Sequence, residues 1–230
     1  MARTTAADRR QQLIEAAFRV MARDGVAAAT TRAIAAEAGA PLATFHYAFR
    51  SKEELLRELT PAIVDRMLNA ATNAITPGHD LKESLRNSFR SMWAVSEATI
   101  SEQHVLYELT QYALRNPGLE DLAHWQYQRY AETARQYLQA AGDAADVHWT
   151  PSLAVASRIV VSFLDGLALG WLVDRNSGEA RAAIDTFAEQ LATLARPRDA
   201  IDLGRGDSRN DHPERRVKSR TARTPTSSPH

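Results

Sequence analysis

The 230-residue chain contains no cysteine, which excludes disulfides, thiolate nucleophiles and thiolate metal ligands. It also lacks the continuous run of about 18 apolar residues that a membrane-spanning helix needs. Its first twelve residues are polar and contain no apolar core of a signal peptide. We therefore expect a soluble, cytoplasmic protein that does not bind a membrane.

The chain also lacks the motifs on which common catalytic sites are built. It contains no glycine-rich phosphate loop, no His-x-x-x-His pair and no Gly-x-Ser-x-Gly nucleophile motif. Its seven histidines are scattered along the chain. We therefore expect neither an enzyme nor a protein that holds a cofactor or a metal ion.

Charge is balanced over the whole chain but unevenly distributed along it. Residues 1–58 contain 9 basic against 7 acidic residues, residues 59–195 contain 10 against 16, and residues 196–230 contain 9 against 5. A basic surface favours contact with phosphates, although a surplus of two is too small to predict DNA binding by itself. Residues 196–230 contain few large apolar side chains, so we expect a disordered basic tail there.

Signals for β-strands are scarce, because the chain has neither a sustained alternation of apolar and polar residues nor an Asn-Gly or Asp-Gly hairpin. Apolar residues instead recur at three- and four-residue spacing up to about residue 195. This periodicity predicts an all-α protein of about nine helices.

Glycine, proline and polar capping residues are expected to set the helix ends. Gly142 should end a helix that begins at Leu119. The stretch Ser51–Glu54 forms a capping box that opens another helix, in which the Ser51 hydroxyl bonds the Glu54 amide and the Glu54 carboxylate reaches back. Pro61 should kink this helix or split it after Leu59, and the residues Thr76–Gly78 should end it.

A helix-turn-helix pattern follows the expected first helix, Ala6–Asp24. Two short helices meet at Gly39, which tolerates a tight turn, and Pro41 suits the first position of the second helix. Phe45 and Phe49 should face the core. In such a unit the second helix enters the DNA major groove and its early residues touch base edges.

The first 58 residues resemble the tetracycline-repressor-like (TetR) family of regulators. The residues that carry the resemblance are Leu13–Phe18, Gly25, Thr30–Thr31, Ile34–Ala35, Ala38–Gly39, Thr44–Phe49 and Ser51–Leu55. The resemblance implies a helix-turn-helix DNA-binding domain over residues 1–58 and a helical ligand-binding and dimerisation domain over residues 59–195.

The resemblance also implies which side chains contact DNA. Lys52 matches the family's phosphate-contacting lysine, whereas His46, Tyr47 and Ala48 depart from its aromatic-polar pattern and leave open which side chain contacts phosphate and which a base. Thr44 is suited to read a base by a hydrogen bond. The expected DNA-binding residues are Thr31, Arg32, Pro41, Leu42, Ala43, Thr44, His46, Tyr47 and Lys52.

Aromatic side chains and methionines recur along the helices of residues 59–195, with polar side chains among them. Such mixtures line pockets between bundle helices, although any single member is more often a core residue. We therefore expect a largely apolar pocket for a small molecule. The candidates that line it are Met67, Phe89, Met92, Trp93, His104, Tyr107, Glu108, Gln111, Trp125 and Phe163.

The last two helices have the apolar stripes of a dimer interface, since two helices from each of two chains build a four-helix interface. Part of these stripes is expected to be buried within one chain. The candidate interface residues are Val155, Ile159, Gly166, Gly170, Trp171, Phe187 and Leu191.

These observations favour a homodimeric repressor that binds a palindromic operator in double-stranded DNA and is released by a small, largely apolar effector. A transcriptional activator or a global regulator of the same fold is the first alternative. A helical scaffold that does not bind DNA is the more remote one.

Overall fold

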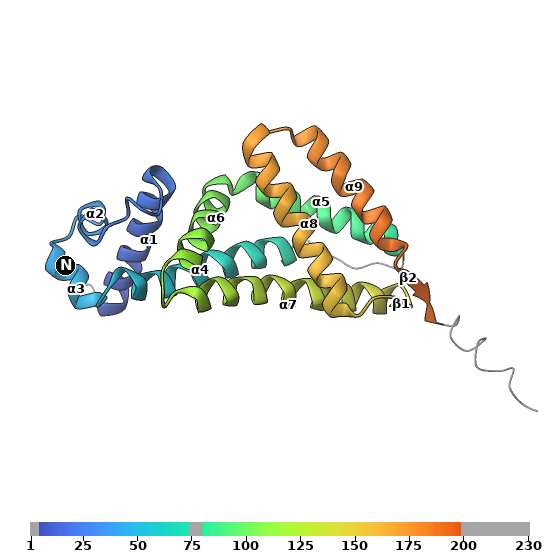
Figure 1. Ribbon diagram of the computed structural model, residues 1–230, viewed down its shortest axis with the longest axis horizontal. Helices are drawn as coiled ribbons and strands as arrows, with labels where there is room; N and C mark the ends of the chain where they lie inside the picture. Colours follow the sequence, from blue (N-terminus) through green and yellow to red (C-terminus); the bar gives the residue numbers. More distant parts are fainter. Residues whose placement is uncertain (1–4, 74–79, 199–230) are drawn as a thin grey trace, which may run out of the picture. The chain divides into compact units, whose positions relative to one another are not determined.

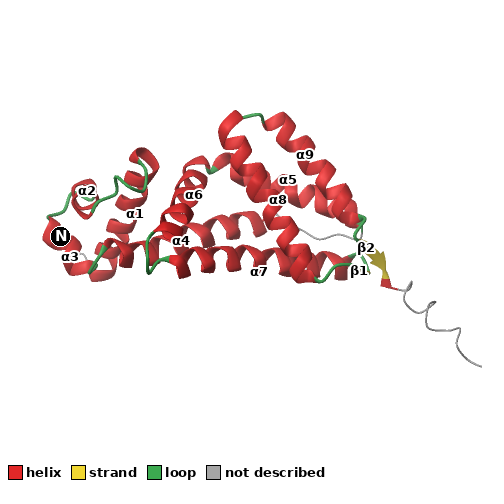
Figure 2. Ribbon diagram, in the orientation of Figure 1, coloured by secondary structure: helices red, strands yellow, loops and turns green. Residues whose placement is uncertain are grey.

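The computed structural model describes residues 5–73 and 80–198, and in this part of the chain it contains nine α-helices and two short β-strands (Figures 1 and 2). The expectation of an all-α protein of about nine helices is confirmed. The expected helix end at Thr76–Gly78 and the expected tail beyond Arg198 lie outside the described residues. In chain order the elements are α1 (Ala6–Asp24), α2 (Thr31–Glu37), α3 (Leu42–Ala48), α4 (Lys52–Asn73), α5 (Leu81–Ala98), α6 (Ile100–Arg115), α7 (Glu120–Ala144), β1 (Val147–Trp149), α8 (Leu153–Asp174), α9 (Ser177–Ala192) and β2 (Ala195–Pro197).

The strands β1 and β2 pair antiparallel, with Val147 opposite Pro197. No strand was expected here, because three residues are too few to show an alternating pattern. The Arg198 amide continues the pairing by donating to the Asp146 carbonyl at 3.2 Å. The prediction that the tail begins at residue 196 is therefore wrong for residues 196–198, which pair with the folded part.

Helix α7 does not end at Gly142, as the sequence suggested, but continues to Ala144. A Cβ atom at Gly142 would lie 3.1 Å from the indole nitrogen of Trp149 and 3.4 Å from the Val147 carbonyl. The same indole nitrogen donates to the Leu138 carbonyl at 2.9 Å. The missing side chain thus lets β1 pack closely on α7 and does not act as a helix stop.

Helix α4 runs through Pro61 without a break, so the predicted split after Leu59 is wrong. Proline removes one helical hydrogen bond. Leu59, Ile63 and Val64 are all buried, and the burial of these apolar side chains offsets that loss.

The start of α4 follows the predicted capping box only in part. The Ser51 hydroxyl accepts a hydrogen bond from the Glu54 amide at 3.2 Å, as expected. The Glu54 carboxylate instead accepts from the amide of Arg50, one residue before Ser51, at 2.8 Å.

The buried side chains form two clusters. One contains side chains of α1–α4, of α6 and of the first turn of α7, so that Phe45 and Leu55 share a core with Val105 and Leu122. The other joins α5, α7, α8 and α9. Since the first cluster extends across residue 58, the helix-turn-helix and the following helices are packed on one another.

Helix α8 has a mean hydropathy of 1.7 and is, by length and composition alone, apolar enough to cross a membrane. The sequence has no continuous run of about 18 apolar residues, and in this helix Arg158 and Asp165 interrupt the apolar residues. In the structure α8 packs against α7 and α9. The large apolar side chains of α8 that remain exposed are Val155, Ile159, Leu169 and Val173.

Candidate functional site

The turn between α2 and α3 fixes the orientation of α3. The Thr30 hydroxyl caps α2 by accepting from the Ala33 amide at 3.1 Å. Gly39 adopts a positive φ of +62°, which favours glycine, and the Ala40 amide bonds the Ala35 carbonyl at 3.0 Å. Helix α3 starts at Leu42, so Pro41 occupies the cap position rather than the first helical position.

The face of α3 that is turned away from the core is open to solvent. Tyr47 is 83% exposed, and His46 beside it is also exposed. Leu42 was expected to face DNA bases, but it is half-buried and packs against the first core cluster. The other expected DNA-binding residues on α2 and α3 are exposed at Arg32, Pro41 and Ala43, and half-buried at Thr31 and Thr44.

Arg50 is an exposed basic residue at this surface that we did not select from the sequence. It lies two residues after the end of α3, and its guanidinium makes no hydrogen bond or ion pair with the described residues. Arg19 and Arg23, by contrast, are both paired with Glu37, at 2.8 and 3.1 Å. A basic residue directly after a recognition helix was the signal that could have identified Arg50.

Arg10 holds α1 on the following helices. Its guanidinium donates to the Ala48 carbonyl and to the carboxylates of Glu54 and Glu58, and lies 4.2 Å from the centroid of the Phe49 ring. These contacts, made at the partly exposed surface, pair the Arg10 guanidinium with groups of the protein itself.

We expect Arg10→Ala to lower the free energy of unfolding by about 1–2 kcal/mol, because it removes hydrogen bonds with charged groups and the interaction with the Phe49 ring. The matched variant Arg9→Ala removes only a hydrogen bond to the Gln12 side chain. It should change the free energy of unfolding by less than about 0.5 kcal/mol. Urea denaturation followed by circular dichroism measures both. Equal effects of the two variants would show that the Arg10 contacts contribute no specific stability.

Lys52 has a different contact from the one that the family resemblance implies. Its ammonium donates to the Val26 carbonyl at 2.7 Å and lies 4.8 Å from the centroid of the Tyr112 ring. Burial lowers the pKa of this ammonium below its usual value. In this structure Lys52 therefore joins α4 to the loop after α1 and to α6, rather than extending toward a phosphate.

Glu108 on α6 holds the other side of the same peptide segment. Its carboxylate accepts a hydrogen bond from the Val26 amide at 2.7 Å. A Cβ atom at Gly25, whose φ is +85°, would lie 3.2 Å from that carboxylate. We had assigned Glu108 to the pocket, but it connects α6 directly to the loop between α1 and α2.

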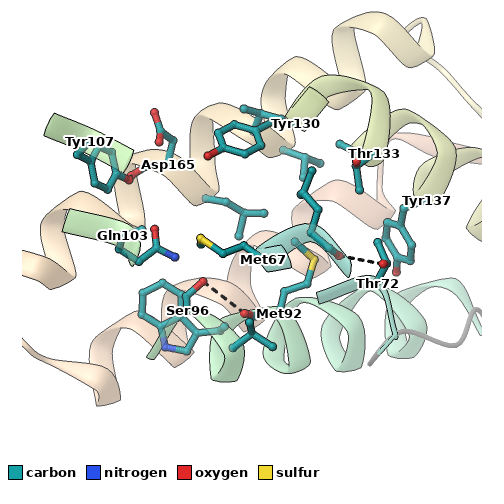
Figure 3. A pocket seen from close by; sticks show the side chains of 18 residues that line it. Met67, Thr72, Met92, Ser96, Gln103, Tyr107, Tyr130, Thr133, Tyr137 and Asp165 are labelled. Atoms are coloured by element: carbon teal, nitrogen blue, oxygen red, sulfur yellow. Dashed lines mark hydrogen bonds between the residues drawn. The ribbon is translucent and has the colours of Figure 1, made fainter. Parts of the chain in front are cut away.

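A cavity of about 160 Å³ lies among helices α4, α5, α6, α7 and α8 (Figure 3). Four of the ten side chains predicted to line a pocket are on its wall: Met67, Met92, Trp93 and Tyr107. Figure 3 shows Met67 and Met92 in the middle of the wall, with the Gln103 amide turned toward Met67.

The other six predicted pocket residues lie elsewhere. The Phe163 ring stacks on Phe187 with 3.8 Å between the ring centroids, and Phe89 packs against the same ring at 5.6 Å. These side chains fill the second core cluster and are not available to a ligand. Of the other four, Trp125 packs on the first cluster and Gln111 is exposed. His104 lies 3.1 Å from the Arg175 guanidinium, and the Glu108 carboxylate accepts from the Val26 amide.

The polar end of the cavity was mostly missed from the sequence. The Tyr107 hydroxyl donates to the Asp165 backbone carbonyl at 2.6 Å, and the Tyr127 hydroxyl donates to the Asp165 carboxylate at 2.6 Å. Burial, to which the Asp165 charge adds, raises the pKa of the Tyr107 and Tyr130 hydroxyls, so both stay protonated. Burial also raises the pKa of Tyr137 to about 12.

The predicted dimer residues divide into two groups. Val155, Ile159, Gly166 and Gly170 are exposed on α8. Trp171, Phe187 and Leu191 instead pack within the second core cluster, where the Trp171 and Trp93 rings meet edge to face at 5.5 Å. Trp171 and Leu191 are buried in that core, whereas Phe187 is only partly buried there.

Comparisons with known proteins match both halves of the chain. Residues 13–59 match the family model described as bacterial regulatory proteins of the tetR family. Residues 81–196 match the model for the C-terminal domain of BetI-type transcriptional repressors.

Individual relatives agree with the family models. HdnoR, the nicotine-responsive transcriptional repressor of Paenarthrobacter nicotinovorans, is 29% identical over 189 residues, which cover 81% of this chain and 95% of HdnoR. The multidrug-binding protein EbrR, crystallised with imidazole, is 27% identical with a TM-score of 0.59, over 82% of this chain and 95% of EbrR. A transcriptional regulator from Rhodococcus sp. Rha1 shares the fold with a TM-score of 0.67 at 21% identity, over 81% of this chain and 97% of that one.

The two family models and HdnoR describe regulators of transcription and not enzymes, which confirms the expectation that the chain is not an enzyme. The motif residues before and within α3, the open face of that helix and the helical body after it all fit the same assignment. The chain belongs to the TetR family of bacterial transcriptional regulators.

Proposed function

We propose that the protein is a repressor that binds a palindromic operator as a homodimer and is released by a small, largely apolar effector. The observation that carries this proposal is the cavity of about 160 Å³ in the body of a chain whose recognition helix is open to solvent. Apolar cavities with a few polar groups between bundle helices are typical ligand sites.

The exposed face of α8 supports the proposed dimer. Val155, Ile159, Leu169 and Val173 are 51%, 38%, 51% and 81% exposed. At 100° per residue these positions fall on one stripe of the helix. A Cβ atom added at Gly166 would meet no atom within 4 Å, so a second helix has room to approach this stripe closely.

We propose that this stripe packs on the same stripe of a second copy, with Gly170 also at the contact. Such an isologous pair has twofold symmetry, which matches the symmetry of a palindromic operator. It also accounts for the apolar length of α8 without a membrane.

An effector would act by changing the distance between the two α3 helices. Helices that enter successive major grooves must be about 34–36 Å apart. A ligand that binds better to a dimer with another spacing shifts the population away from DNA, and only its differential affinity for the two states counts. The names of two relatives, nicotine-responsive HdnoR and multidrug-binding EbrR, support a small molecule as the signal.

The proposed DNA contacts on α2 and α3 are Thr31, Arg32, Ala43, Thr44, His46 and Tyr47, with Arg50 added from the structure. The hydroxyl, imidazole and guanidinium groups suit phosphate oxygens. Thr44 and Ala43 are the side chains suited to read base edges, by a hydrogen bond and by contact with a thymine methyl.

Binding to DNA from immediately upstream of the protein's own gene tests the proposal. We expect Arg50→Ala to weaken binding by about five- to tenfold and to reduce the slope of log affinity against log salt by about 0.9 for each phosphate that the variant no longer neutralises. Arg115→Ala, which removes an exposed arginine from the end of α6, should leave affinity and slope unchanged. Fluorescence anisotropy at salt concentrations between about 50 and 200 mM measures both quantities.

Tyr47→Ala in the same assay should weaken binding without changing the fold, since the ring is exposed. Natural protein that binds this DNA no more tightly than random DNA would contradict repression of its own gene. If instead binding is tight and unaffected by Tyr47→Ala and Arg50→Ala, the proposed DNA face of α3 is wrong.

A further inference from the structure

We propose that the ligand of the cavity is an organic cation with an apolar ring, and that Asp165 supplies the opposite charge. This inference rests on the proposed effector role of the cavity and names the chemical class of its ligand.

The size of the cavity limits the ligand. Its volume is about 160 Å³. An engineered apolar cavity of about 150 Å³ holds a benzene molecule. A ligand with one aromatic ring and a few further heavy atoms therefore fits the space.

Aromatic rings surround this space. Trp93, Tyr107, Tyr130 and Tyr137 line it from α5, α6 and α7. The face of an aromatic ring carries partial negative charge and attracts a cation within about 6 Å. The remaining wall is mainly methionine and aliphatic side chains, which favour an apolar body on the same ligand.

The described wall of the cavity carries negative charge and no positive charge. Asp165 is the only carboxylate among the described lining residues, and none of them is a lysine, an arginine or a histidine. Asp165 is half-buried, and its side chain receives one hydrogen bond, from the Tyr127 hydroxyl to Oδ2 at 2.6 Å. No basic side chain in the described part of the chain lies within ion-pair distance of this carboxylate. Burial and the Asp165 charge raise the pKa of the Tyr127 hydroxyl, and the charge of the exposed Arg158, the one basic residue of α8, lowers it in part.

A carboxylate that is half-buried and makes no ion pair favours a ligand that brings positive charge. Attraction between charges acts over several ångströms where water is scarce, so the cation does not need to touch the carboxylate. An anionic ligand would instead meet repulsion from Asp165, and no described lining residue carries a positive charge to offset it. Figure 3 shows Thr72, Thr133 and Tyr137 at one end of the cavity, whereas the Tyr130 hydroxyl is turned toward Asp165 at the opposite end.

Gln103 gives this end a neutral hydrogen-bonding group. Its side chain is almost fully buried and makes no hydrogen bond with the described residues. A carboxamide donates and accepts equally well, so it binds a polar ligand atom of either kind. The selection for charge is therefore assigned to Asp165 and the rings, not to Gln103.

Two probes of the same shape separate charge from size. Phenyltrimethylammonium and tert-butylbenzene differ only in a positively charged nitrogen in place of a carbon. Each is titrated into the full-length protein and followed by tryptophan fluorescence, since Trp93 lines the cavity. We expect the cation to bind at least about tenfold more tightly than the hydrocarbon.

Asp165→Asn should lower the affinity for phenyltrimethylammonium by about tenfold and change that for tert-butylbenzene by less than about twofold. Asparagine keeps an oxygen that accepts from Tyr127, so the wall should remain folded. Asp174→Asn, the same change at the end of α8 outside the cavity, should alter neither affinity.

Equal affinities of the natural protein for the two probes would overturn the cation proposal, as would an equal loss of both in Asp165→Asn. Failure of both probes to bind would overturn it as well. Operator binding is measured without any probe, so loss of the proposed repressor function is distinguished from loss of this inference. If tert-butylbenzene alone binds and releases the operator, the repressor proposal stands and the assigned ligand class is wrong.

Discussion

The variant Leu169→Glu is expected to be monomeric at micromolar concentration and to bind a palindromic operator at least about 100-fold more weakly than the natural protein. Leu169 is 51% exposed in the middle of the apolar stripe of α8. In the proposed dimer its side chain would be buried against the second copy, where an unpaired carboxylate is strongly unfavourable. Two linked recognition helices gain about 10²–10⁴-fold over one, and a monomer loses that gain.

Sedimentation equilibrium and fluorescence anisotropy measure the two effects on the same samples. The control is Leu114→Glu, which introduces the same charge at an apolar residue of α6 that is 58% exposed and lies outside the stripe. It should remain a dimer with natural operator affinity. A dimeric Leu169→Glu variant would refute the α8 interface, whatever its affinity for DNA.

The second large effect is expected at Phe45, whose side chain is fully buried between α3 and the first core cluster. Phe45→Ala should lower the free energy of unfolding by about 3–5 kcal/mol, because a large buried ring is lost and a cavity is left. Its ring lies 5.8 Å from that of Phe49, so the loss extends to the end of the recognition helix.

His46→Ala, at the adjacent position, is the matched comparison. His46 is exposed, so its loss should change stability by less than about 0.5 kcal/mol while weakening operator binding. Urea denaturation and DNA titration of both variants distinguish the core position from the DNA-facing one. A stable Phe45→Ala variant, or an unstable His46→Ala variant, would mean that the two faces of α3 are assigned the wrong way round.

The helices and their order were predictable because their signals are local. Thr30 and Ser51 are followed by the residues whose amides they cap, and Gly39 stands where a positive φ is needed. Each of these interactions joins residues a few positions apart, so a single sequence contains both partners. The predicted split at Pro61 is absent, because the burial of side chains such as Leu59 and Val64 on α4 outweighs the local effect of the proline.

The cavity wall was only partly predictable, because apolar side chains look alike in a sequence whether they face a core or a cavity. Phe89 and Met92 lie three residues apart on α5, yet Phe89 packs on Phe187 and Met92 faces the cavity. The position of Phe187 on α9 decides between them, about a hundred residues later in the chain. Asp165 was noticed as a polar residue of an apolar helix, and its isolation from basic groups became evident only from the fold.

The contacts that Glu108 and Lys52 make within the chain were not predictable for the same reason. Glu108 bonds a backbone amide 82 residues before it, and Lys52 bonds a carbonyl 26 residues before it. Neither contact can be predicted from the residue types near Glu108 or Lys52 in the sequence. The family resemblance implies that Lys52 contacts a phosphate. In the structure its ammonium lies beside the Tyr112 ring of α6.

The backbone of Val26 is bonded to two helices at once. Its amide donates to Glu108 of α6, and its carbonyl accepts from Lys52 of α4. Tyr107, the neighbour of Glu108, lines the cavity. If a ligand in the cavity shifts α6, the shift would strain or break the hydrogen bond between Glu108 and the Val26 amide, in the loop that leads into α2. Thermodynamic reciprocity then applies in the opposite direction: if an effector weakens operator binding by some factor, a bound operator weakens effector binding by the same factor. The apparent affinity for an inducer would accordingly depend on how much of the protein is already on DNA.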